Sequence, residues 1–325
     1  MTSARQLIAM IRSHAAGDND KFMSIAESIA LDAQKTGKNK MAKDILGAVE
    51  ALRYEPPKTS IAPIPLAMPR GELAGLIHAS YPDVRLQDLV LSGDLERRIT
   101  RAVREHRQSE LLLKSGLRPR RKYLFSGPPG TGKGMTAAAV AGELNLPLFT
   151  ILLDGVITKF MGETATKLRQ VFDSMRTQRG VYFFDEVDAL ASRRDADNDI
   201  GEARRMLNSF LQFLEDDRSG SIIIAATNHK SLLDPAIFRR FDAAFAYAKP
   251  TGEEACRVMR NNLKQFDTEA LDWGSIAKAS VGLSQADIVA AAGDAARDAV
   301  LDNKSKLSTK IVIQSINDRK TIHPD

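Results

Sequence analysis

The sequence contains little cysteine and no long apolar run, and each absence excludes a class of protein. Cys256 is the single cysteine, so the chain has no internal disulfide and no zinc site built from CxxC pairs, and it suits a reducing compartment. No stretch approaches the ~18 apolar residues that cross a membrane. The first residues lack the apolar core of a secretory signal peptide. We therefore expect a soluble, cytoplasmic protein without membrane association.

The remaining composition is that of an ordinary globular protein. Hydrophobic residues make up 43% and charged residues 27% of the 325 positions, which excludes a disordered chain, a collagen and a coiled-coil rod. This length suits about two domains. The net charge of +5 admits nucleic acid, polyphosphate or an acidic protein as a partner. Ten of the lysines and arginines lie within residues 97–122.

Two changes in composition divide the chain. Apolar residues at helical spacing in residues 2–53 predict three short amphipathic helices, a small bundle suited to an adaptor or oligomerisation module. Residues 55–69 hold five prolines, which favour an extended linker. The expected domains are a helical module at 1–54, a proline-rich linker at 55–82, an α/β domain at 83–249 and a helical lid at 250–325.

Apolar runs alternate with helical patterns after the linker, as in a parallel sheet flanked by helices. The run at 181–184 is apolar at every position, which is typical of a strand covered on both faces. Beyond Pro250 only helical patterns continue. The expected fold class is α/β, and residues 71–82 are ambiguous. The expected strands are 123–126, 146–153, 181–184, 221–227 and 245–247.

A glycine-rich segment, GPPGTGK, lies between an expected strand and an expected helix. In this context glycines let successive backbone N–H groups surround phosphate oxygens, and the final lysine, Lys133, reaches the β- and γ-phosphates. A plain turn between strand and helix is the alternative, which the lysine disfavours. The residues of the predicted phosphate loop are Gly127, Pro128, Pro129, Gly130, Thr131, Gly132, Lys133, Gly134 and Met135.

Residue 134 departs from this motif, because glycine stands where serine or threonine offers a hydroxyl to Mg²⁺. Thr136, two residues on, faces elsewhere on the helix. Water can replace the missing oxygen, since Mg²⁺ readily keeps several waters. We expect nucleotide binding to survive and Mg²⁺ geometry and turnover to be altered. Alternatively, Gly134 only eases close packing at the start of the helix.

Polar residues end the next two strands of the predicted core. Asp185 and Glu186 follow the apolar run at 181–184, at the edge where ligands of open parallel sheets bind. Asp185 would orient Mg²⁺ through water, and Glu186 would act as general base on the attacking water. Asn228 would hold that water or sense the γ-phosphate. The alternatives are a helix N-terminus for the acidic pair and a turn residue for the asparagine.

Two adjacent arginines, Arg239 and Arg240, follow Asn228 after a short helical pattern. An arginine inserted into a neighbouring subunit's site stabilises the charge of a transferring phosphoryl group and contributes about 10³–10⁵ in rate. The alternative is a surface ion pair.

Taken in order, GPPGTGK, FFDEVDAL, AATN, DPAIFRRFD and VGLSQADI resemble the AAA clade of the AAA+ ATPases, the group of spastin, katanin and the membrane-anchored protease FtsH. The resemblance covers residues 84 to about 318. It implies a P-loop NTPase core, ATP and Mg²⁺ as ligands, and a hexameric ring in which the adjacent subunit completes each site. It also implies roles for single residues: an adenine pocket of Asp88, Leu89 and Val90, closure over the ribose by Gly282, Leu283 and Ser284, a sensor at Asn228, and arginine fingers at Arg239 and Arg240.

The same resemblance implies a loop that grips polypeptide in the channel of the ring, formed by Lys159, Phe160 and Met161, with Phe160 as the gripping residue. The alternative for Phe160 is a core side chain. Residues 193–198 match a second, charged pore loop.

The whole chain resembles small bacterial AAA ATPases that are typically encoded beside a subtilisin-like serine protease, a pairing associated with plasmid incompatibility and phage defence. The chain has neither a GxSxG nor an HExxH pattern, so it is not itself a protease. We expect an ATP-driven remodeller that moves a protein substrate past Phe160 and serves such a protease. The alternatives are a nucleotide-dependent switch or scaffold with weak hydrolysis because of Gly134, and a nucleic-acid-associated ATPase. The clustered basic residues suit ATP and subunit contacts better than DNA.

Overall fold

A computed structural model describes residues 19–35, 75–153, 163–190, 199–230, 235–301 and 306–322, together with residues 40, 42, 43, 45 and 47. The chain divides into two compact units, Met1–Pro65 and Leu66–Asp325. In the first unit, helix α2 (Asn19–Lys35) buries four side chains at the spacing of one helix face: Ala26, Ile29, Ala30 and Ala33. An amphipathic helix is therefore confirmed here. The other two helices expected in 2–53 lie largely outside the described residues.

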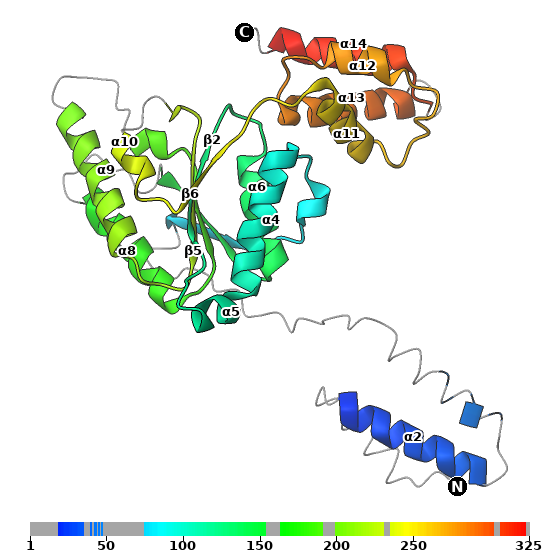
Figure 1. The fold of residues 1–325 in the computed structure, drawn as a ribbon. Helices are drawn as coiled ribbons and strands as arrows, with labels where there is room; N and C mark the ends of the chain where they lie inside the picture. Colours follow the sequence, from blue (N-terminus) through cyan, green and yellow to red (C-terminus); the bar gives the residue numbers. More distant parts are fainter. Residues whose placement is uncertain are drawn as a thin grey trace. The chain divides into compact units, whose positions relative to one another are not determined.

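The second unit contains a six-stranded sheet with the order β1-β3-β4-β5-β2-β6 (Figure 1). Strand β1 pairs antiparallel with β3, and the other neighbouring strands are parallel. The five strands expected from the sequence are confirmed, with bounds that differ by at most two residues. The strands are β1 (Ile77–Ser80), β2 (Lys122–Ser126), β3 (Leu148–Ile151), β4 (Val181–Phe184), β5 (Ile222–Thr227) and β6 (Ala243–Ala246).

Strand β1 lies in the segment that the sequence patterns left ambiguous. Only Ile77 among its four residues is buried, so its apolar pattern is weak. Its pairing with β3 runs from Ile77 opposite Ile151 to Ser80 opposite Leu148. The long-range ladder, rather than a local pattern, therefore determines this edge strand.

Helices cover both faces of the sheet (Figure 1). Helices α4 (Gly93–Arg107) and α6 (Lys133–Leu144) pack on one face, and α8 (Glu163–Thr177) and α9 (Asp199–Asp216) pack on the other. The shorter elements of this part are η2 (Leu86–Asp88), α5 (Ser109–Lys114), η3 (Val187–Leu190) and α10 (Pro235–Phe238).

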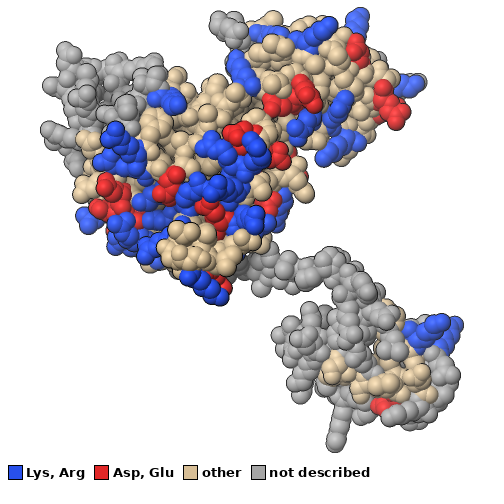
Figure 2. Space-filling view, viewed as in Figure 1, with Lys and Arg blue, Asp and Glu red and all other residues tan. Residues whose placement is uncertain are grey.

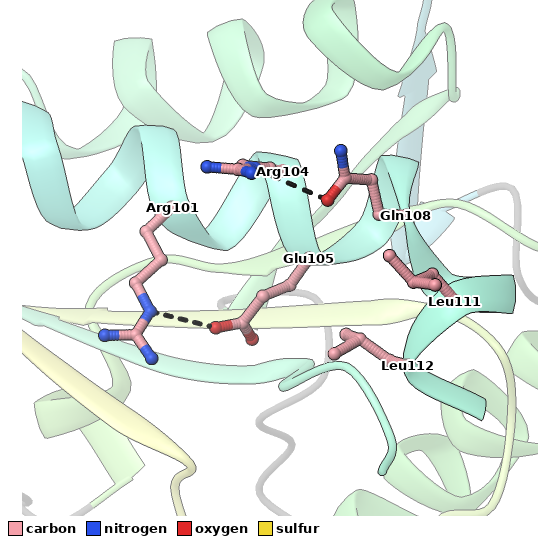
Figure 3. A pocket seen from close by; sticks show the side chains of 6 residues that line it. All are labelled: Arg101, Arg104, Glu105, Gln108, Leu111 and Leu112. Atoms are coloured by element: carbon pink, nitrogen blue, oxygen red, sulfur yellow. Dashed lines mark hydrogen bonds and ion pairs between the residues drawn. The ribbon is translucent and has the colours of Figure 1, made fainter. Parts of the chain in front are cut away.

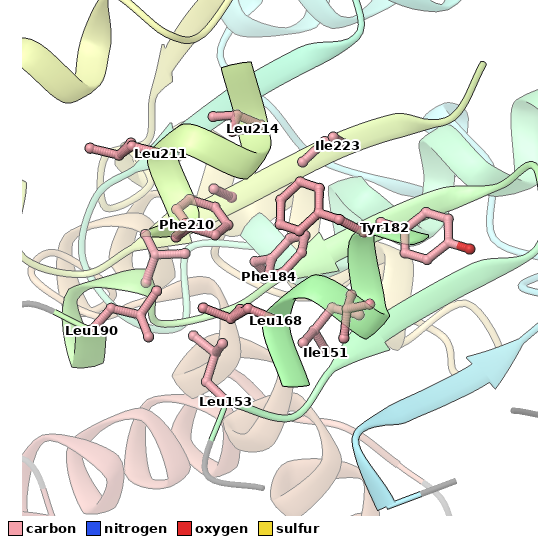
Figure 4. Packing of buried hydrophobic residues seen from close by; sticks show 14 of the residues in the cluster. Ile151, Leu153, Leu168, Tyr182, Phe184, Leu190, Phe210, Leu211, Leu214 and Ile223 are labelled. Atoms are coloured by element: carbon pink, nitrogen blue, oxygen red, sulfur yellow. The ribbon is translucent and has the colours of Figure 1, made fainter. Parts of the chain in front are cut away.

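Strand β4 shows why an entirely apolar run belongs at the centre of such a sheet. Successive side chains of a strand point to opposite faces. Val181 and Phe183 join the cluster beneath α4 and α6, whereas Tyr182 and Phe184 join the cluster beneath α8 and α9. Figure 4 shows Phe184 beside Phe210 of α9, with ring centroids 5.1 Å apart. Full burial of one such side chain stabilises the fold by about 1.5–3 kcal/mol.

The residues described after Pro250 form four helices around a separate hydrophobic cluster: α11 (Gly252–Asn262), α12 (Trp273–Ala279), α13 (Gln285–Leu301) and α14 (Thr309–Ile322). Thr251 begins α11 with a capping box, in which its Oγ1 accepts from the Glu254 amide at 3.2 Å and the Glu254 carboxylate accepts from the Thr251 amide at 2.8 Å. The helical part expected here is confirmed. Among the helices that the structure describes, none is long and apolar enough to cross a bilayer.

Candidate active site

The predicted phosphate loop connects the end of β2 to the start of α6. Gly127, Gly130 and Gly132 have positive φ angles of 152°, 70° and 92°, which glycine adopts without steric cost. A Cβ at Gly127 would lie 2.3 Å from the Tyr247 carbonyl oxygen, and a Cβ at Gly130 would lie 2.5 Å from Ser284 Oγ. These glycines are therefore required both by the backbone conformation and by the close packing of Tyr247 and Ser284, and the loop leads into the N-terminus of α6, which anions favour.

Lys133 is the buried cation of this loop, with 6% of its surface exposed. Its ammonium group donates three hydrogen bonds of 2.8 Å, to the carbonyl oxygens of Gly127 and Pro128 and to Oδ1 of Asn228. Burial lowers the pKa of Lys133, and the nearby carboxylate of Asp185 opposes that effect. Two carbonyl groups and one amide side chain thus fix the position of the Lys133 ammonium group beside the loop.

The acidic pair and Asn228 lie at the same edge of the sheet as the loop. Strands β4 and β5 are neighbouring and parallel, with Phe184 opposite Ala225, so the residues that follow them meet. Nδ2 of Asn228 lies 3.4 Å from Oε1 of Glu186, to which it donates. One amide side chain therefore contacts both Lys133 and Glu186, and the sequence patterns did not predict these two contacts.

Asp185 and Glu186 have distinct local environments. Glu186 has a positive φ of 52°, an unusual backbone conformation for a residue with a side chain, and such strain clusters at functional sites. Its amide donates to Oδ1 of Asp185 at 3.0 Å. Burial raises the pKa of Asp185, and this hydrogen bond and the charge of Lys133 oppose the rise.

The donor set suits a phosphate-bound Mg²⁺ rather than an ion held by protein alone. Among the described residues no group of three or more acidic, histidine or cysteine side chains could hold a metal ion. Magnesium sites commonly use one or two carboxylates together with substrate phosphates and waters. Asp185 is the carboxylate at this edge that fits such a role.

Gly134 is not required by packing. A Cβ at this position would have the Phe183 ring as its nearest neighbour at 3.7 Å, an ordinary contact, so the interpretation that glycine eases close packing here is wrong. The hydroxyl of Thr136 donates to the Gly132 carbonyl at 2.9 Å and the residue is fully buried. The hydroxyl of Thr136 is therefore engaged by the backbone one helical turn earlier.

The helical lid contacts the loop directly. The Ala286 amide donates to the Gly130 carbonyl at 3.0 Å, and the Gln285 side chain donates to the Val90 carbonyl at 2.7 Å. Val90 is itself part of the lid cluster, whereas Leu89 packs on the cluster beneath α4 and α6. The segment expected at the adenine thus joins the two parts of the unit.

The remaining residues of this proposed pocket have local roles as well. Oδ2 of Asp88 accepts from the Arg85 amide at 2.8 Å and closes the η2 turn. Ser284 and Asp287 exchange hydrogen bonds at the start of α13. Gly282 has a φ of 90° just after α12. The residues that the resemblance assigns to the adenine and the ribose therefore lie in the lid or where the lid joins the α/β part.

The two arginines after α10 have different surroundings. Nε of Arg240 donates to the Glu215 carboxylate of α9 at 3.2 Å. Arg239 is exposed, and within the described ranges it has neither a hydrogen bond nor an ion pair. The structure therefore separates two residues that the sequence left equivalent.

Asp242 is a residue of this segment that sequence reasoning missed. Its Oδ2 accepts from the amides of Arg121 and Lys122 at 2.8 and 2.9 Å, which fastens the segment after the arginines to the start of β2. Asp242 closes the motif FRRFD two residues after the paired arginines, and this position was the signal that could have indicated its role. The expected pore residues 159–161 and 193–198 lie outside the described part of the chain.

Known proteins match this chain both in the core and over nearly its full length. A family model, the ATPase family associated with various cellular activities (AAA), matches residues 123–248. An uncharacterized AAA family ATPase, y4kL, of Sinorhizobium fredii is 33% identical over 305 residues, which cover 93% of this chain and 91% of that protein.

Other relatives are longer proteins. A proteasome-activating nucleotidase of Methanococcus vannielii is 34% identical over 62% of this chain and 51% of its own length. The ATP-dependent zinc metalloprotease FtsH of Helicobacter pylori is 28% identical over 76% of this chain and 40% of its own length. The match thus spans about half or less of these two relatives. With the phosphate loop, the acidic pair and the match to y4kL together, the chain belongs to the AAA family of ATPases and is an ATP-hydrolysing enzyme.

Proposed function

We propose that this ATPase works as a homo-oligomeric ring, of hexameric form, that uses ATP and Mg²⁺ to move a protein substrate. The observation that carries the proposal is the contrast between its two arginines. Arg240 is held by Glu215 of its own chain, whereas Arg239 is exposed. An exposed arginine with no partner among the described residues is available to enter the site of a neighbouring subunit.

The chemistry follows from the groups at the edge of the sheet. Lys133 would hold the β- and γ-phosphates, and Asp185 would orient, through water, a Mg²⁺ ion that supplies neutralisation of the phosphate charge. Glu186 accepts a proton from water as the water oxygen bonds to the γ-phosphorus and the bond to ADP breaks. Asn228, 3.4 Å from Glu186, keeps the base aimed at the water. Arg239 of the adjacent subunit stabilises the charge on the transferring group.

Protein is the proposed substrate. Two relatives are named for activating a proteasome and for ATP-dependent proteolysis, which supports a role in preparing proteins for degradation. Lys159, Phe160 and Met161 would grip the polypeptide. A subtilisin-like serine protease is the proposed partner, in a bacterial defence or plasmid-incompatibility system, because this chain resembles ATPases encoded beside such proteases. The adenine pocket of Asp88, Leu89 and Val90 and the ribose contacts of Gly282 and Ser284 remain part of this proposal.

The experiment compares Phe160→Ala with Glu186→Gln in the full chain, using ATP turnover and ATP-dependent unfolding of a fluorescent protein fused to an unstructured tail. Phe160→Ala should keep turnover and lose unfolding. Glu186→Gln should bind ATP and lose both activities. Unfolding that survives Phe160→Ala would exclude Phe160 as the gripping residue, and an unaltered protein that hydrolyses ATP without unfolding the substrate would exclude the remodelling function.

A second candidate is a nucleotide-dependent switch or scaffold, which Gly134 favours. The position lacks the hydroxyl ligand for Mg²⁺ although a side chain has room there, and weak hydrolysis would leave ATP binding to assemble the ring. Fast Mg²⁺-dependent turnover that Glu186→Gln eliminates would exclude the switch.

A further inference from the structure

Helix α5 exposes leucines that the fold does not use. Its sequence is SELLLK, and none of its six residues is buried. Leu111 and Leu113 are 62% and 56% exposed, and Leu117, just beyond the helix, is 58% exposed. Neither hydrophobic cluster of the α/β part includes them. Exposed apolar side chains that gather in one short segment, unlike ones scattered singly over a surface, can mark an interaction site.

A cavity of about 290 Å³ opens between the C-terminal half of α4 and α5, with Leu111 in its lining (Figure 3). Pockets for small ligands begin near ~300 Å³, so this cavity suits one bulky side chain better than a cofactor. Its lining combines an apolar wall with polar and charged residues: Arg101, Arg104, Glu105, Gln108, Leu111 and Leu112.

The cavity is positively charged because its carboxylate is already paired. Glu105 contacts Arg101 at 3.3 Å and Arg120 at 2.5 Å, and the hydrogen bond from Arg120 lowers the pKa of Glu105. Arg104 donates only to the neutral side chain of Gln108, at 3.4 Å. The charge of Arg104 therefore has no carboxylate partner in the part of the chain that the structure describes.

The surface around α5 is also positively charged. Lys114 and Arg118 flank the exposed leucines and are exposed themselves, and neither forms an ion pair with a described residue. Glu110 is the acidic residue of α5. In Figure 2 an uncharged surface over α5 is bordered by lysine and arginine side chains. Cations thus outnumber carboxylates on the surface formed by α5 and the cavity, which we call the α5 surface.

We propose that the α5 surface binds a short acidic segment of a partner protein, with one apolar side chain of that segment in the cavity and its carboxylates on Arg104 and Lys114. The concave shape favours a protruding side chain over a flat bilayer. The surface has no aromatic residue on which bases could stack, and exposed leucines do not attract phosphates, so nucleic acid fits less well. Charge complementarity would give such a partner specificity and a salt-dependent association rate.

The test begins with random nine-residue peptides displayed on phage and selected against the full chain. We expect enrichment of peptides in which Asp or Glu residues flank a Leu, Ile, Phe or Met. The same selection on the Leu111→Asp protein should not enrich them. Both proteins should have the same far-UV circular dichroism, because Leu111 lies outside every hydrophobic cluster. Equal enrichment on both proteins, or no acidic-apolar pattern, would overturn the proposal.

The dominant peptide is then measured by fluorescence anisotropy. Arg104→Glu and Leu111→Asp should each weaken binding about tenfold or more, as expected for residues at the centre of an interface. The matched controls are Arg97→Glu, an exposed arginine on the same helix, and Leu301→Asp, a leucine of the lid that is 79% exposed. Both controls should bind the peptide like the unaltered protein, and raising the salt concentration should weaken binding.

Further readouts separate this proposal from the proposed function. ATP turnover should be unchanged in all four variants, since none lies in the phosphate site. A failure of peptide binding would therefore overturn this proposal without affecting the proposed ATPase function. If Arg104→Glu and Leu111→Asp instead reduce the oligomer mass in ATP, the surface is a contact between copies of this chain. If they abolish binding to phosphatidylserine vesicles that the unaltered protein binds, the surface is a membrane site. Either result would overturn an acidic protein partner.

Discussion

The ammonium group of Lys133 donates a hydrogen bond of 2.8 Å to Oδ1 of Asn228. A carboxamide has both an acceptor and a donor, and the same side chain of Asn228 donates to Glu186. The proposed phosphate-binding cation and the proposed general base are therefore positioned by one residue. Asn228 thus connects the residue proposed to bind phosphate with the residue proposed to activate water. Among the hydrogen bonds of the described residues, none joins Lys133 directly to Glu186.

Removing that amide should affect catalysis more than binding. Asn228→Ala deletes both contacts, while Lys133 keeps two carbonyl acceptors. We expect kcat to fall by about 10²-fold, the usual effect of losing one preorganised polar group, with a smaller change in KM for ATP. Steady-state ATP hydrolysis measures both. His229→Ala, at the exposed next position, is the control. Unchanged kcat in Asn228→Ala would show that this amide does not position the base.

Restoring a hydroxyl at position 134 should improve the use of Mg²⁺. The nearest neighbour of an added Cβ is 3.7 Å away, so Gly134→Thr and Gly134→Ala should both fold. Gly134→Thr alone supplies an oxygen ligand, and we expect it to raise turnover and to lower the Mg²⁺ concentration that gives half-maximal turnover. Gly134→Ala controls for the added carbon. Identical Mg²⁺ dependence in the two variants would mean that water fully replaces the missing hydroxyl.

The two arginines should differ in mutants. Arg239→Ala is expected to lower turnover about 10³-fold or more if it acts across the subunit boundary. Arg240→Ala removes a partly exposed ion pair with Glu215, an interaction worth ~0.2–1 kcal/mol, and should leave turnover nearly intact. Mixing Arg239→Ala with Glu186→Gln subunits should restore part of the activity, because some interfaces then combine an intact finger with an intact base. No recovery on mixing would contradict action in trans.

Cys256 reports on the lid. Burial raises the pKa of this thiol, and the residue is 6% exposed within the lid cluster. Because the thiolate is the reactive form, the folded protein should react with iodoacetamide far more slowly than the protein in urea, and the native rate should rise only at alkaline pH. Since Cys256 is the single cysteine, the reaction reports only this site. Equal rates in buffer and urea would contradict the burial of Cys256 by showing that the lid helices do not stay packed around it.

Local patterns were sufficient for much of the fold. The run at 181–184 predicted a strand covered on both faces because successive side chains of a strand point to opposite faces, and Phe183 and Phe184 do join opposite clusters. The phosphate loop was predictable because backbone sterics restrict its positive φ angles to glycine. The order of the parallel strands then brought Asp185, Glu186 and Asn228 to one edge.

Contacts between distant residues decided the rest. Strand β1 exists through its ladder with β3, and its own pattern is too weak to predict it. Adjacent arginines look equivalent in sequence, but Glu215 of another helix holds only Arg240. The partners of Asn228 and the exposed leucines of α5 also depend on where other elements pack. Sequence alone therefore determined which elements and chemical groups this protein has, whereas the tertiary structure decided which groups meet, because side-chain partners are chosen by long-range packing rather than by local backbone preference.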